Sequence, residues 1–103
     1  MNFIFFVTVP SLEEGKKIGR EMVENRLAAC VNIAQDIHSI YRWKGKVEVA
    51  NEVLLIMKTT GKNAAALIEK IEKIHPYETP ECVGFPIKKG SEKYLKWLEK
   101  VVK

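Results

Sequence analysis

The sequence predicts an α+β domain in which two helices cover one face of a four-stranded antiparallel sheet. Residues 3–9 and 53–57 are continuous apolar runs rich in β-forming side chains, as expected of strands buried on both faces. A segment with helical spacing of apolar residues follows each run. The order is therefore strand, helix, strand, strand, helix, strand, with a short helix at the end. Right-handed crossovers then give the sheet order 4-1-3-2, with the two apolar strands in the centre.

The first helix has a recognisable start and end. Ser11 and Glu14 match a capping box, so Ser11 is the expected N-cap. Gly15 and Gly19 lie on the inward side and are expected to allow a close approach to the sheet. Asn25 is expected to take the left-handed conformation that ends the helix.

The second and third strands are predicted to form one long hairpin. Apolar and polar residues alternate over 27–33 and again over 37–43, and residues 47–57 return as the third strand. The turn lies at 44–46, where Gly45 supplies the positive φ.

The remaining elements follow from capping and proline signals. Thr60 is the expected N-cap of the second helix, whose apolar face runs over 64–74. Residues 81–88 alternate as a fourth strand, and Pro86 indicates that this strand lies at an edge. Ser91 is the expected N-cap of the short last helix.

The bulk numbers indicate one soluble domain, residues 1–103. The 47% apolar and 29% charged residues are ordinary for a globular protein. The net charge of +4 is too small and too interleaved for a nucleic-acid-binding excess. No apolar run approaches the ~18 residues of a membrane span. We therefore expect a cytoplasmic protein with neither a nucleic acid nor a membrane as partner.

The predicted sheet has one face that the two main helices do not cover. On that face the side chains of strands one and three are apolar and would be wet in a monomer. Apolar patches of this size usually mark an interface, and a long projecting hairpin adds an exposed edge. The pattern therefore predicts an obligate homo-oligomer.

Residues 75–80 form a stiff polar connector between the second helix and the fourth strand. Proline biases the residue before it toward extended backbone, so the helix must stop near His75. The connector carries the imidazole of His75, the phenol of Tyr77 and the carboxylate of Glu78. Functional groups often lie on such loops, although a plain helix stop would have the same composition.

A candidate cleft gathers around Lys58, which follows five apolar residues at the end of the third strand. A lysine in this setting needs a carboxylate, and Glu78 is the candidate. With Arg26, Asn32 and Tyr77, this pair can line a cleft between subunits that holds a small anion. A structural salt bridge explains the same residues.

Two further residue types on the strands are open to more than one interpretation. Tyr41 and Trp43 alternate on one hairpin face, where they can pack against a neighbouring subunit or stack on a ligand, and Trp43 is counted with the residues of the intersubunit cleft. Cys30 and Cys82 fall on opposite edge strands, ~14 Å apart, which is too far for an intrachain disulfide.

Five segments resemble motifs of the CutA divalent-cation tolerance proteins, in that family's order and over nearly the whole chain. They are ENRLAACVN at 24–32, SIYRWKGK at 39–46, KT at 58–59, HPYETP at 75–80 and YLKWL at 94–98. The resemblance implies a ferredoxin-like βαββαβ fold assembled as a tight trimer, with hairpins that pair with neighbouring sheets. It also implies tolerance to divalent metals, copper above all, a likeness to the trimeric PII signalling proteins, and no enzymatic activity.

The resemblance implies His75 as a copper ligand, and the thiol of Cys30 is a second soft candidate. A capping role for His75 and a buried structural role for Cys30 are the alternatives. Two other ligand positions proposed in the family hold Val7 and Ile74 here. Copper or another divalent ion is therefore an expected ligand but not a required cofactor, and a signalling or structural trimer without a metal site is the second hypothesis.

Three other functions are common among proteins with this strand order, but the sequence lacks the residues that each of them requires. RNA-binding domains carry aromatic side chains on the third strand, and residues 53–57 have none. Residues 7–11, which follow the first strand, contain neither the cysteines of a metallochaperone nor the arginine of an acylphosphatase-like phosphate loop.

Overall fold

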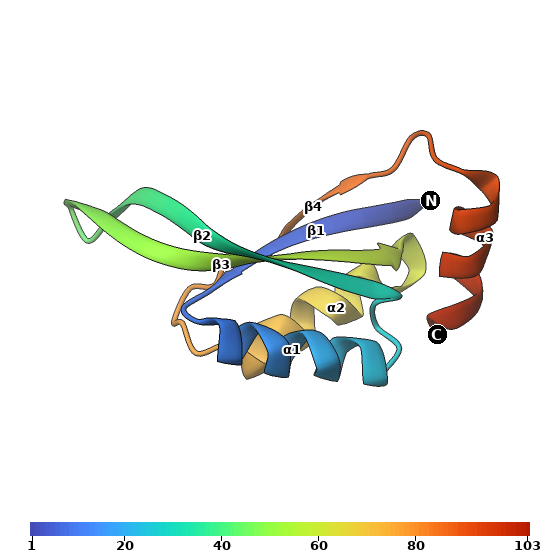
Figure 1. The fold of residues 1–103 in the computed structure, drawn as a ribbon, viewed down its shortest axis with the longest axis horizontal. Helices are drawn as coiled ribbons and strands as arrows, with labels where there is room; N and C mark the ends of the chain where they lie inside the picture. Colours follow the sequence, from blue (N-terminus) through green and yellow to red (C-terminus); the bar gives the residue numbers. More distant parts are fainter.

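The computed structural model describes residues 1–103 and confirms the predicted α+β order. The elements are β1 (Asn2–Val9), α1 (Leu12–Glu24), β2 (Cys30–Trp43), β3 (Lys46–Thr60), α2 (Gly61–Ile74), β4 (Val83–Pro86) and α3 (Glu92–Val101) (Figure 1). The sheet is antiparallel throughout, in the order β2-β3-β1-β4. None of the helices is long and apolar enough to cross a membrane.

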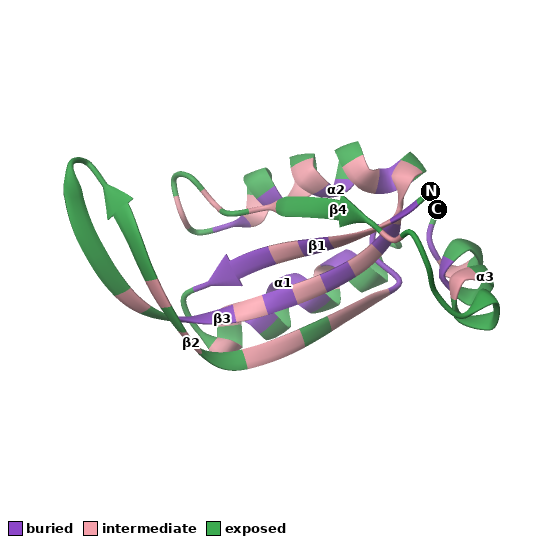
Figure 2. Cartoon of the chain, turned by 90° about the horizontal axis from the view of Figure 1, so that it is seen from above, coloured by how far each residue is buried: buried purple, intermediate pink, exposed green.

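The core lies between the sheet and the two helices α1 and α2, which cover the same face (Figure 1). Every second residue of β1 and of residues 53–57 in β3 points into it, and Figure 2 shows the resulting alternation along β3. The central core side chains are Phe5, Val7, Val9, Ile18, Met22, Val53, Leu55, Met57, Leu67 and Ile71.

The glycines of α1 permit the close helix–sheet contact that the sequence predicts. A Cβ on Gly15 would lie 3.2 Å from a methyl carbon of Leu55, and one on Gly19 would lie 3.2 Å from Val31. These are tight contacts, so larger residues would push the helix away from the sheet.

Two of the three expected N-caps make the capping bond. The Glu14 amide donates to the Ser11 hydroxyl at 3.1 Å, and the Tyr94 amide donates to the Ser91 hydroxyl at 3.4 Å. Thr60 occupies the N-cap position of α2 but makes no side-chain cap bond.

The end of α1 differs from the expectation by one residue. Asn25 has φ −84°, and Arg26 takes the left-handed conformation with φ 59°. Arg26 is held there by the C-terminus, because its Nε donates to the Val101 carbonyl at 3.1 Å and its own carbonyl accepts from the Lys103 amide at 3.0 Å.

The hairpin of β2 and β3 projects beyond the helices (Figure 1). Its turn has positive φ at both Lys44 and Gly45, as the primed two-residue turn requires. A bulge between Ala34 and Ile37, with Asp36 at φ 61°, shifts the register of the two strands. The sequence showed a break in the alternation here, but it did not predict the bulge.

The fourth strand is shorter than predicted. β4 is limited to four residues, and Pro86 lies on the sheet edge as expected. Cys82 falls just before this strand, and Cys30 begins the opposite edge strand, so the two thiols are free.

The face of the sheet opposite α1 and α2 is only partly covered and is mainly apolar. Directly paired residues of an antiparallel sheet share a face, so the register places six apolar side chains together on it. This open face consists of Ile4 and Phe6 of β1, Leu54 and Ile56 of β3, and Val83 and Phe85 of β4. The helix α3 and its C-cap pack at the end of the sheet, through Leu98 and Val102 against Ala29.

Candidate functional site

The residues predicted to form one cleft lie in three places in the chain. Trp43, Tyr77 and Glu78 line a cavity of about 920 Å³ between the hairpin and the connector 75–80. Lys58 and Asn32 lie on the open face, and Arg26 anchors the C-terminus.

His75 fastens the connector to the end of β1. Its Nε2 lies 2.7 Å from the Thr8 carbonyl oxygen, and its Nδ1 accepts from the Tyr77 amide at 3.0 Å. A carbonyl only accepts, so the neutral tautomer protonated at Nε2 satisfies both bonds. The residue is 8% exposed, and both ring nitrogens are used by the protein itself. The structure thus gives His75 the capping and hydrogen-bonding role that was the alternative to metal ligation.

Next to His75, Tyr77 holds a buried carboxylate that the sequence analysis missed. The Tyr77 hydroxyl donates to Glu52 Oε2 at 2.7 Å, and Glu52 is only 7% exposed. Burial and the Glu52 carboxylate raise the pKa of Tyr77 well above its usual range, so the phenol stays protonated and remains a donor. The only sequence signal was an acidic residue placed directly before the apolar run 53–57.

We expect Tyr77→Phe to remove the highest-pH step in an absorbance titration of phenolate formation. The folded protein holds the Tyr77 proton more tightly than the unfolded chain, so its contribution to stability is present below pH ~10 and is lost as the pH rises further. The variant should also be less stable by about 1–3 kcal/mol at neutral pH, because Glu52 loses its donor. An unchanged titration curve would show that Tyr77 is not the shielded phenol.

Lys58 pairs with Asn32 and not with Glu78. The ammonium group donates to Asn32 Oδ1, and its Nζ lies 3.9 Å from Cys30 Sγ. The register explains this outcome, because Cys30 is directly opposite Lys58 and Asn32 is the next residue on the same face. The prediction of a Lys58–Glu78 pair is therefore wrong for the single chain.

Burial and the neighbouring Cys30 thiol raise the pKa of Tyr94.

The chain matches the family model described as CutA1 divalent ion tolerance protein over residues 3–101. It belongs to the CutA family of divalent ion tolerance proteins.

Relatives of this CutA chain come from several kingdoms. The chain is 46% identical over 98 residues to the divalent-cation tolerance protein CutA of Thermus thermophilus, covering 95% of each. The chain is also 46% identical over 96 residues to mouse Protein CutA. That alignment covers 93% of this chain but 54% of the mouse protein. The chain thus spans about half the length of the mouse relative.

Solved CutA structures have the same fold. The divalent cation tolerance protein of Thermus thermophilus superposes with a TM-score of 0.97 at 44% identity, covering 100% of both chains. CutA1 from Oryza sativa superposes with a TM-score of 0.96 at 42% identity, covering 99% of this chain and 94% of that one.

The side chains of this CutA member do not fit a metal site within one chain. No group of three or more His, Cys, Asp or Glu side chains is arranged to hold an ion. Cys30 lies in the row of Lys58 and Ile4, whereas His75 contacts Thr8, four residues or ~13 Å farther along β1. The two predicted ligands therefore do not meet in the single chain.

The second cysteine, Cys82, is partly buried and packs against the core. Burial, reinforced by Glu72 and Glu81, raises the pKa of the Cys82 thiol to about 11. The thiol is therefore protonated at neutral pH, which disfavours both metal ligation and nucleophilic reactivity.

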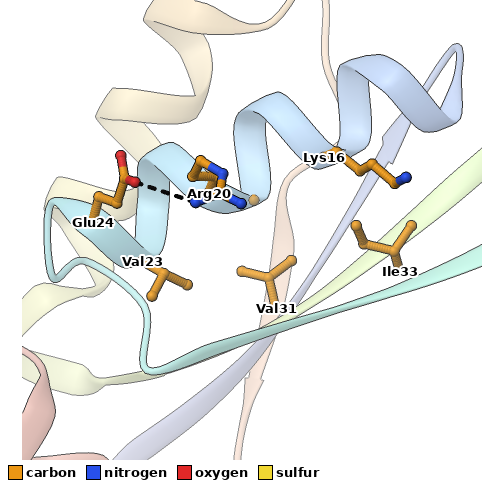
Figure 3. A pocket seen from close by; sticks show the side chains of 7 residues that line it. Lys16, Arg20, Val23, Glu24, Val31 and Ile33 are labelled. Atoms are coloured by element: carbon orange, nitrogen blue, oxygen red, sulfur yellow. Dashed lines mark ion pairs between the residues drawn. The ribbon is translucent and has the colours of Figure 1, made fainter.

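A second hollow of about 510 Å³ lies between α1 and β2, as Figure 3 shows. Val23 of α1 lies opposite Val31 and Ile33 of β2 there, and Arg20 is paired with Glu24 at 3.5 Å. It contains none of the predicted site residues.

Proposed function

We propose that this CutA protein acts in divalent-cation tolerance as a homotrimer that binds ligands between its subunits and catalyses no reaction. Family membership supports the tolerance role at a general level. We place the protein in the cytoplasm, with further copies of itself as its partner and no nucleic acid or membrane.

The open face is the observation that supports the oligomer most strongly. Its six apolar side chains are contiguous across three strands, and Phe6 and Phe85 meet edge to face at 5.4 Å between ring centroids. An apolar surface that is this continuous favours burial against other subunits, since each Å² removed from water contributes about 25 cal/mol. The projecting end of the hairpin, residues 40–49, is exposed in the single chain and would reach a neighbouring sheet in the same assembly.

We propose that the ligand clefts of the trimer include the cavity at the hairpin. Trp43, Tyr77 and Glu78 already line it in one chain. Because the hairpin is the element expected to meet a neighbour, a second subunit would complete this cavity. Such clefts between subunits would give this protein the likeness to PII signalling proteins that its sequence motifs imply.

We propose Cys30 as the residue that binds copper. Its thiol is half-exposed, and it is the remaining soft ligand because both ring nitrogens of His75 are already hydrogen-bonded to Thr8 and Tyr77. The same engagement of His75 favours the second hypothesis, a signalling or structural trimer with no physiological metal site.

Titration calorimetry with Cu(I), Cu(II) and Zn(II) separates these two hypotheses. We expect Cys30→Ser to weaken Cu(I) binding by about tenfold or more, because a hydroxyl is a poor ligand for a soft ion. Cys82→Ser is the matched control and should leave binding unchanged. A wild-type trimer that binds no metal would support the signalling or structural trimer instead.

A further inference from the structure

The cavity at the hairpin has charges of one sign. Three carboxylates line it, from Glu52 of β3 and from Glu78 and Glu81 of the connector region. The lining contains no lysine or arginine, and its one other titratable side chain besides two phenols is His38. Its electrostatic character is therefore opposite to that of the anion-binding cleft that the sequence predicted around Lys58.

These carboxylates have no cation partner in the chain. The four ion pairs of the protein use Glu21, Glu24, Glu69 and Glu92. The deeply buried Glu52 receives only the hydroxyl of Tyr77, through one of its two oxygens. Removing a carboxylate from water without a cation is unfavourable, so a positively charged ligand that entered the cavity would be stabilised there.

Aromatic rings line the same space. Tyr41 and Trp43 are 46% and 37% exposed, and Tyr77 is the third aromatic residue with a ring and hydroxyl in the lining. Trp43 already holds an ammonium group, since Lys44 Nζ lies over its ring, 5.8 Å from the centroid. Carboxylates combined with ring faces are the usual environment for an organic ammonium ion.

Size and geometry distinguish an organic cation from a metal. The volume of about 920 Å³ is that of a small-molecule site. The carboxylates do not converge on one point, because no three ligating side chains are placed to hold a metal ion. A ligand with several separated positive charges matches separated carboxylates better than a single ion does.

We propose that this cavity binds an aliphatic polyamine, whose ammonium groups pair with Glu52, Glu78 and Glu81 and whose methylene chain lies on the rings of Tyr41, Trp43 and Tyr77. The inference rests on the proposed function, because it names the ligand class of the cleft proposed there. Each chain contributes all six of these side chains.

Calorimetric titration of the full chain with spermidine tests the inference. We expect binding to the wild type, and binding about tenfold or more weaker in the double variant Glu78→Gln/Glu81→Gln, which loses two of the three carboxylates. Both residues are exposed, so this variant should fold. The control Glu13→Gln/Glu69→Gln removes two exposed charges from α1 and α2 and should bind within about twofold of the wild type. Trp43→Leu should also weaken binding, and citrate should not bind.

Three results would overturn the inference. The first is no spermidine binding at millimolar concentration. The second is equal binding by Glu78→Gln/Glu81→Gln and the wild type. The third is Mg²⁺ or Cu²⁺ binding that depends on these carboxylates and is tighter than the binding of spermidine. Sedimentation of the same samples keeps the two proposals distinct. If the protein is a trimer but does not bind spermidine, only the proposed polyamine site is contradicted. If the protein is a monomer that binds spermidine, only the proposed trimer is contradicted.

Discussion

Aspartate in place of Phe6 is expected to convert the assembled protein into single chains. Phe6 lies in the middle of the open face, paired with Ile56 on one side and Val83 on the other. If that face is buried between subunits, each copy would place an unpaired carboxylate in the interface, at about 3–5 kcal/mol per chain. In the single chain the face is only partly covered, so the fold itself should tolerate the charge better than the assembly does.

Sedimentation velocity at micromolar concentration measures this effect, and circular dichroism shows whether the chains remain folded. Ile56→Asp should act in the same way from the neighbouring strand. Ala66→Asp adds the same charge to the exposed side of α2 and should leave the assembly intact. A Phe6→Asp protein that sediments like the wild type would show that the open face is not the interface, and the proposed trimer would fail with it.

The fold was predictable because its signals are local. Apolar runs at 3–9 and 53–57 identified the central strands, and capping residues such as Ser11 located helix starts. The bulge at Asp36 was not predictable, because the register of two strands depends on packing across the sheet. The left-handed residue was likewise displaced from Asn25 to Arg26, since the carbonyl of Val101, distant in sequence, holds the arginine side chain.

The sequence indicated several residues of the candidate site, but it did not indicate which of them contact one another. The sequence indicated His75, Tyr77 and Glu78 as candidate functional groups on a connector that a plain helix stop would also explain, and the structure places Tyr77 and Glu78 at the cavity. The sequence alone could not pair Tyr77 with Glu52, because 25 residues separate them and only the packing of the connector against the sheet brings them together. A carboxylate partner was predicted for Lys58 because a partly buried lysine usually pairs with one. The strand register instead places Asn32 beside Lys58, and the two side chains form a hydrogen bond.

His75→Ala is expected to lower the free energy of unfolding by about 2–4 kcal/mol, because it leaves both the Thr8 carbonyl and the Tyr77 amide without partners. It also opens a void next to the Tyr77 ring, whose centroid lies 4.8 Å from that of the imidazole. Chemical denaturation of wild type and variant measures the difference.

The structural role of His75 is separated from metal ligation by a chelator and a conservative variant. His75→Gln retains an N–H that can donate to Thr8, so it should recover part of the lost stability although a glutamine amide is a poor copper ligand. His38→Ala, an exposed histidine of the hairpin, should change stability by less than about 0.5 kcal/mol. A chelator should alter none of these values. Loss of wild-type stability on chelation, with no such loss in His75→Ala, would instead make the imidazole a ligand and require its contact with Thr8 to break when metal binds.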